Sequence, residues 1–151
     1  MNSRFNMSMV NPWVWVLAWM GVIFVFSTDH FSGAQTSRFI GPVLKWIMPS
    51  ISDESIANVQ LAARKTAHLA EYAILSILIC RALAKRAALG SLQLVVLGQA
   101  VLIAAAYAAF DEWHQSWTTE RHGSILDVGI DTAGAVIGAA FFAWLSRREK
   151  E

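Results

Sequence analysis

Four long apolar runs constrain the fold of this chain more than any other feature of the sequence. They cover approximately residues 9–27, 66–84, 89–110 and 125–145. Each is long enough, or nearly so, to cross about 30 Å of hydrocarbon as an α-helix. In lipid the backbone must satisfy its own hydrogen bonds, which a helix does. The sequence therefore predicts an all-α integral membrane bundle of four transmembrane helices, with residues 1–151 forming a single domain.

The composition agrees with a membrane class. Hydrophobic residues make up 56% of the chain and charged residues only 15%, against about 25% charged in soluble domains. A net charge of +1 gives no reason to expect nucleic-acid binding. The first run could be read as a signal peptide, but Trp13, Trp15 and Trp19 are unusual there and no good cleavage site follows, so we expect a retained helix. Cys80 is the single cysteine and is expected to be a small buried apolar side chain.

The distribution of charged residues predicts the orientation of the helices. Seven of the twelve basic residues lie before the first run, at or just after the end of the second, and after the fourth. Only two of the eleven acidic residues, Glu149 and Glu151, lie in those segments. The positive-inside rule then places both termini in the cytoplasm and the other two loops outside the membrane. The predicted location is a bacterial cytoplasmic (inner) membrane, crossed by a multi-pass protein.

The first outer loop carries an amphipathic pattern. Apolar residues recur at helical spacing between 39 and 47, and Gly41 and Pro42 predict that any helix there is short and broken. Ser52 and Asp53 provide an N-cap signal for the next helix, expected over 54–84. We expect an amphipathic extracytoplasmic loop that covers the outer end of the bundle.

Three stripes of polar residues lie at the outer ends of the second, third and fourth helices. The second helix carries Arg64, Lys65, His68, Glu71 and Tyr72; the third carries Asp111, Glu112, His114 and Gln115; the fourth carries Ser124, Asp127 and Asp131, followed by Gly134 and Gly138. Within each stripe the residues recur at helical spacing. Three stripes at one side of the membrane can meet in one polar cleft. The glycines, spaced as GxxxG, support close helix packing.

Several uses of this cleft are compatible with the residues. Opposite charges can simply pair, for example Lys65 or Arg121 with Glu112, Asp127 or Asp131, and lock the helices. Crowded carboxylates beside a histidine are also candidates for general acid–base chemistry. No HExxH or CxxC spacing is present, so the sequence predicts no metal site and no cofactor. The inner helix halves lack the polar residues of a channel.

The order of these residues resembles the signature of VanZ-like membrane proteins. The resemblance rests on Lys65-x-x-His68-x-x-x-Tyr72, Glu112-x-x-Gln115, Arg121, Ser124, Asp127, Asp131 and Gly134-x-x-x-Gly138. It covers about residues 60–142, with a similar preceding helix. Asp131 stands where asparagine is frequent in that family. The family is linked to teicoplanin resistance, so the resemblance implies a bacterial envelope protein and, more weakly, antibiotic resistance.

Three hypotheses follow. In the first, the cleft binds an extracytoplasmic lipid-linked or glycopeptide-like ligand through Arg64, Lys65, His68, Tyr72, Glu112, Gln115, Arg121, Asp127 and Asp131. In the second, the protein is a membrane-embedded enzyme in which His68 works with Glu112 or Asp127 as an acid–base pair. In the third, the polar residues only hold the helices together and no ligand binds. Membrane lipids are the partners common to all three.

Overall fold

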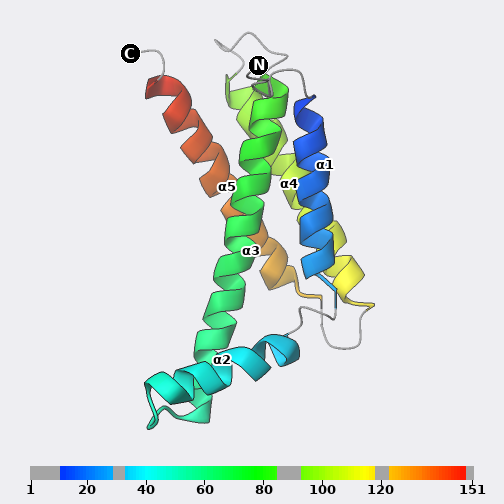
Figure 1. Cartoon of the computed structure of the whole chain (residues 1–151). Helices are drawn as coiled ribbons and strands as arrows, with labels where there is room; N and C mark the ends of the chain where they lie inside the picture. The colour runs from blue at the N-terminus through cyan, green and yellow to red at the C-terminus, as the bar shows by residue number, and fades with distance from the viewer. Residues whose placement is uncertain (1–10, 29–32, 85–92, 118–122, 149–151) are drawn as a thin grey trace, which may run out of the picture.

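A computed structural model describes residues 11–28, 33–84, 93–117 and 123–148 of the 151-residue chain. Over these residues the chain forms the helices α1 (Pro12–Phe26), α2 (Gly33–Ile47), α3 (Asp53–Ala84), α4 (Gln93–Gln115) and α5 (Ile125–Arg148), with no strand among them. Figure 1 shows α1, α3, α4 and α5 running side by side, with α2 lying across one end of α3. The all-helical prediction is confirmed.

Three of the helices, α3, α4 and α5, are long and apolar enough to cross a membrane. The first predicted transmembrane helix is shorter than expected, since α1 has 15 residues, or about 22 Å at 1.5 Å per residue. Asn11 begins it by accepting a hydrogen bond from the Trp13 N–H, and Pro12 occupies the first turn, where proline is tolerated. The described part of the chain thus contains three helices of membrane-spanning length and one shorter apolar helix.

Helix α3 lies at the centre of the fold, because it contacts each of the other four helices. Two long-range hydrogen bonds fix α1 in place. The Trp19 indole donates to the Glu71 carbonyl on α3 over 2.9 Å, and the Tyr107 hydroxyl on α4 donates to the Met20 carbonyl over 2.7 Å. The apolar core between the helices contains Cys80, which is fully buried and free, as predicted.

Helices α3 and α5 make the most extensive contact in the fold. A Cβ added at Gly134 would collide with the backbone of Leu69, and one added at Gly138 with the backbone of Ala73. The glycines therefore let the two backbones approach as closely as they do. This confirms the close packing that the GxxxG spacing predicted.

The prediction of a broken helix in the first loop is wrong. Helix α2 continues through Gly41 and Pro42. A proline inside a helix removes one backbone hydrogen bond, and here tertiary packing offsets that loss: α2 packs on the first turns of α3, with Gly41 close to Ile56 and Gln60. Lys45 forms a 2.7 Å ion pair with Asp53. The predicted cap is present, since Ser52 Oγ accepts from the Ser55 N–H.

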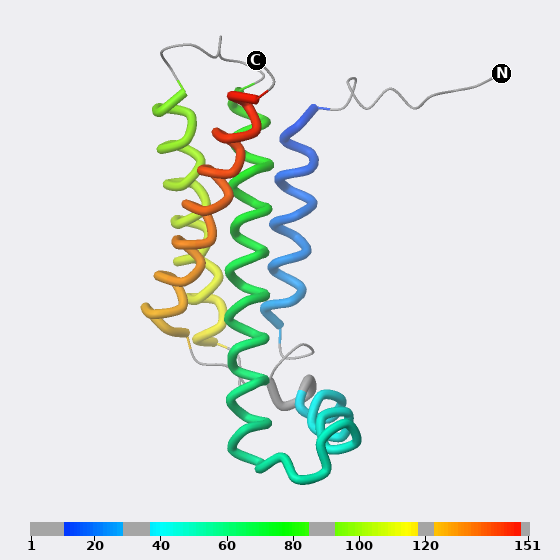
Figure 2. The backbone as a smooth tube through the Cα atoms, turned by 90° about the vertical axis from the view of Figure 1, so that its left-hand side faces the viewer, coloured from blue at the N-terminus to red at the C-terminus, as the bar shows by residue number. Residues whose placement is uncertain are grey.

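The two ends of the bundle differ in character. Figure 2 shows the C-terminal ends of α3 and α5 together at one end, while the end of α4 and the start of α5 lie at the other, on the side of α2. Arg81, Arg147 and Arg148 belong to the last turns of α3 and α5. The acidic residues Asp111, Glu112 and Asp127 belong to the opposite end. This end carries the candidate site.

Candidate functional site at the acidic end of the bundle

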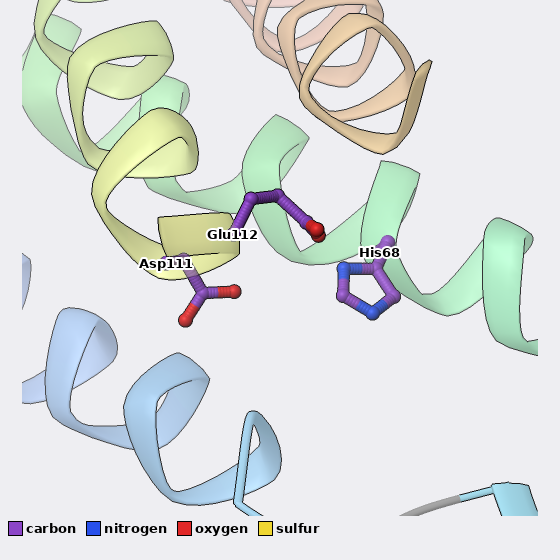
Figure 3. Close-up of side chains that lie close together, drawn as sticks. All are labelled: His68, Asp111 and Glu112. Carbon is purple, nitrogen blue, oxygen red and sulfur yellow. The ribbon is translucent and has the colours of Figure 1, made fainter. Parts of the chain in front are cut away.

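The three polar stripes converge, as their spacing predicted. His68 comes from α3, Asp111 and Glu112 from the last turns of α4, and Asp131 from the second turn of α5. Figure 3 shows one ring nitrogen of His68 facing the Glu112 carboxylate, with Asp111 beside them. His68, Asp111 and Glu112 each offer one ligand atom, and these atoms lie within 4.8 Å of one another. Residues 44 positions apart along the chain thus form one cluster, which could hold a metal ion.

His68 and Asp131 form the most deeply buried charged contact of the site. His68 Nδ1 lies 3.4 Å from Asp131 Oδ1, and the aspartate side chain is fully buried. Neither Asp131 oxygen has a hydrogen-bond partner among the residues described, and the same is true of His68 Nδ1. A buried carboxylate without hydrogen bonds is costly. Such a group, buried against a histidine, is a candidate for function.

Glu112 is held by the start of α5. Its Oε2 accepts a 2.8 Å hydrogen bond from the backbone N–H of Ser124, the residue that precedes α5. Ser124 Oγ in turn accepts from the Leu126 N–H at 3.2 Å. The free N–H groups and positive dipole end of a helix N-terminus favour a carboxylate. The Ser124 N–H therefore holds the Glu112 carboxyl group in place, facing His68 (Figure 3).

Two further predicted residues support the cluster from α4 and from α3. Gln115 Nε2 donates to Asp111 Oδ2 over 2.9 Å, within one helical turn. Tyr72 lies one turn from His68 and is fully buried, and its hydroxyl has no hydrogen-bond partner among the described residues. Both side chains are buried, so neither can contact a ligand from the protein surface.

Asp127 lies at the more exposed edge of the site. It is 3.9 Å from Lys65, and both side chains are partly exposed, at 30% and 43%. This is one of the ion pairs expected for a structural clamp. Because Asp127 pairs with Lys65 while Glu112 faces His68, the geometry favours Glu112 over Asp127 as the acid–base partner of the histidine. Arg121 was predicted to join the site and lies outside the described residues.

A pocket of about 510 Å³ opens beside the cluster, between α1, α2 and α3. Its wall is mostly apolar and includes Ile23, Phe26, Ile40, Leu61 and several alanines. Its polar lining comes from Ser27, Ser37, Gln60, Arg64, His68 and Glu71. His68 therefore belongs both to the pocket and to the carboxylate cluster, and Arg64 and Glu71 face the pocket rather than the cluster.

The first outer loop was expected to cover the outer end of the bundle, but the pocket that α1 and α2 form with α3 was not predicted. Ser37 Oγ donates to Gln60 Oε1 over 2.8 Å and links α2 to α3 at its rim. One signal was available, because Gln60, Arg64, Ala67 and Glu71 recur every three or four residues and mark one face of α3. The sequence did not indicate that this particular face of α3 would meet α1 and α2.

Comparison with known proteins identifies the family. The family model VanZ/LLP1 matches residues 12–146, which include all five helices except the last two residues of α5. Searches of curated proteins and of solved structures gave no significant match. The match covers nearly the whole chain, and the long apolar helices are those of a multi-pass membrane protein. The chain belongs to the VanZ/LLP1 family.

Proposed function

We propose that this protein is a four-span protein of a bacterial cytoplasmic membrane that binds a lipid-linked envelope ligand at its outer face. The observation that carries the proposal is the pocket between α1, α2 and α3, which has a mostly apolar wall and is also lined by His68, a member of the carboxylate cluster. A ligand with an acyl or isoprenoid tail and a polar head matches both parts. A soluble polar ligand would leave the apolar wall without a partner.

The orientation rests on the separation of charges. The arginines of α3 and α5 lie at the end of the bundle opposite to Glu112 and Asp127, and the positive-inside rule places the arginine end in the cytoplasm. Both termini are then cytoplasmic, and α2 is extracytoplasmic. Because α1 is shorter than the membrane is thick, local thinning of the bilayer would complete the span.

Cysteine labelling tests this orientation. In a Cys80→Ala background, Ser116→Cys should react with a membrane-impermeant maleimide added to intact cells, whereas Arg147→Cys should react only after lysis. Both native side chains are at least partly exposed at the ends of helices α4 and α5. The reverse pattern would overturn the orientation.

Arg64 is the strongest candidate for the anionic part of the ligand. It lines the pocket, is exposed, and lies one turn from His68. Lys65 is less suited because it faces Asp127, and Arg121 stays a prediction. A guanidinium can bind a phosphate or carboxylate through two parallel hydrogen bonds. Gln60 and Ser37 supply neutral hydrogen bonds at the rim.

Lipid retention tests the ligand proposal. Native mass spectrometry of the purified protein should detect bound phospholipid or polyprenyl phosphate. Ile40→Trp, which fills the pocket, should abolish retention, and Arg64→Gln should reduce it about tenfold, the loss expected when a charged hydrogen bond is removed. Arg147→Gln, at the opposite end, should retain lipid like the wild type. Unchanged retention in Ile40→Trp would contradict the pocket assignment.

A glycopeptide-like ligand is a second source of the same chemistry, and it would connect this chain to teicoplanin-type resistance. The inhibitory concentration of teicoplanin for cells with and without the protein decides this point. A resistance that Arg64→Gln and Ile40→Trp both remove would favour it. An unchanged inhibitory concentration would leave the envelope lipid as the ligand.

Catalysis is the second candidate function, and the contact between the pocket and an acid–base cluster favours it. His68 lines the pocket and faces Glu112, so it could move a proton at the head group of a bound lipid. Incubation of the purified protein with a labelled polyprenyl-phosphate-linked sugar would reveal head-group release. His68→Ala should stop release while lipid retention persists, and Asp53→Asn should leave both unchanged. Equal release by His68→Ala and wild type would exclude this role for His68.

A further inference from the structure

More than one carboxylate lies close to His68, whereas a proton-transfer pair requires only one. The ligand atoms of His68, Asp111 and Glu112 lie within 4.8 Å of one another, and the three residues come from two helices (Figure 3). Two ligands bonded at about 2.1 Å to one ion lie at most about 4.2 Å apart. That limit applies only to two ligands on opposite sides of the ion. Ligands of a tetrahedral ion lie about 3.4 Å apart, so the widest separation in this cluster would have to close by up to about 1.4 Å.

Asp131 gives an independent indication of a ligand. It belongs to α5, is fully buried, and has no hydrogen bond to either oxygen among the described residues. Its Oδ1 lies 3.4 Å from His68 Nδ1, an atom that likewise has no hydrogen-bond partner in the described chain. This is about the separation of two ligands of a tetrahedral ion with bonds of 2.1 Å. A buried oxygen thus faces the histidine nitrogen at a distance that is long for a hydrogen bond.

The crowding of carboxyl groups around His68 also favours a bound cation. Asp111 and Glu112 share one cluster with His68, and the Asp131 carboxyl group contacts the same histidine. Carboxylates buried this close together repel unless something neutralises them. Lys65 lies at the exposed edge, 3.9 Å from Asp127. The Ser124 N–H orients Glu112 from behind, as outer hydrogen bonds do for the carboxylate ligands of metals.

We propose that His68, Asp111, Glu112 and Asp131 bind one divalent transition-metal ion of the Zn²⁺ or Mn²⁺ type. One imidazole with carboxylate oxygens suits these ions, whereas Mg²⁺ and Ca²⁺ prefer oxygen ligands throughout. The sequence predicted no metal because the ligands come from three helices and form no local motif. The ion would lie beside the pocket, because His68 also forms part of the pocket wall. It does not require a lipid, so the inference goes beyond the proposed lipid binding.

Calorimetry on the full-length protein tests the proposal. Protein purified in detergent and stripped with EDTA is titrated with ZnCl₂ and, separately, with MnCl₂. We expect one ion per chain for at least one of the two metals. Glu112→Gln and Asp131→Asn should each weaken binding at least tenfold. Asp53→Asn, which removes an exposed carboxylate paired with Lys45, should bind like the wild type.

Asp127→Asn separates ligation from bulk charge. It removes a carboxylate from the same site but not a proposed ligand, so it should weaken binding by no more than about threefold. A loss equal to that of Glu112→Gln would overturn the ligand assignment. Stoichiometric binding of none of the metals tested would overturn the site itself.

Circular dichroism and gel filtration without metal verify that each variant is folded. If Asp131→Asn does not fold, Glu112→Gln alone tests the ligand assignment. Lipid retention by native mass spectrometry is a separate readout, so failure of either proposal leaves the other measurable.

Discussion

The contact between α3 and α5 has two halves that differ sharply over a single helical turn. Around Gly134 and Gly138 the two backbones touch, with no space for a Cβ. One turn earlier on α5, Asp131 faces His68, and neither atom of that contact has a hydrogen bond in the described structure. The glycine half brings the backbones together, and this closeness forces the polar half into contact. The close packing at the glycines therefore offsets the cost of burying polar groups without hydrogen bonds one turn away.

The largest expected effect comes from filling the glycine half. Gly138→Leu would place a side chain against the Ala73 carbonyl, where no rotamer relieves the clash. We expect a loss of more than about 3 kcal/mol in unfolding free energy, seen as little monodisperse protein in detergent. Gly129→Leu is the matched control, because the same helix has open space there. Equal damage from both variants would show that the close approach is not the cause.

The polar half should respond in the opposite direction. Asp131→Asn removes a buried charge that has no hydrogen bond among the described residues. In metal-free detergent we expect the unfolding free energy to rise by about 1–2 kcal/mol, measured as a higher thermal midpoint, because burying a neutral amide costs less than burying a carboxylate and this difference outweighs the loss of the 3.4 Å contact with His68. A lower midpoint would indicate that Asp131 is a structural clamp, as the third hypothesis from the sequence holds.

Two tyrosines allow a smaller and better-matched test. Tyr72 lacks a hydrogen-bond partner for its hydroxyl in the described chain, whereas Tyr107 donates to the Met20 carbonyl. Tyr72→Phe should therefore be neutral or stabilising by about 1 kcal/mol, and Tyr107→Phe destabilising by about the same amount. Thermal midpoints of the two variants, measured side by side, check the difference. Destabilisation by Tyr72→Phe would mean that its hydroxyl is bonded in the native membrane.

The smallest effect belongs to the exposed edge of the polar half. Lys65 and Asp127 are 3.9 Å apart and partly exposed, so Lys65→Gln should cost less than about 0.5 kcal/mol. The difference from wild type should vanish in 1 M salt, where exposed charges are screened. A larger, salt-independent loss would show that this pair is shielded from solvent and helps to hold the helices together.

Most of the fold could be predicted from the sequence, because apolar runs of membrane length and polar residues at helical spacing are local patterns. The start of α3 near Ser52 and the close packing at Gly134 and Gly138 follow from such patterns, and both are confirmed. The uninterrupted helix at Pro42 could not be predicted, since packing on α3 overrides the local cost of proline.

The candidate site divides in the same way. The sequence indicated that the three polar stripes share one end of the bundle. It could not indicate that Glu112 would face His68 while Asp127 pairs with Lys65, because those choices depend on how each helix is rotated about its axis. The pocket could not be predicted either, since α1 and α2 form one wall of it.

By itself, then, the sequence determined the all-helical class, the membrane-type helices and the polar residues available at one end. Helical periodicity and hydrophobicity are properties of neighbouring residues, so one chain segment is enough to reveal them. Only the tertiary structure decided that His68, Asp111, Glu112 and Asp131 meet beside an apolar pocket. That meeting depends on two glycines further along α5, whose missing side chains set the distance between the helices.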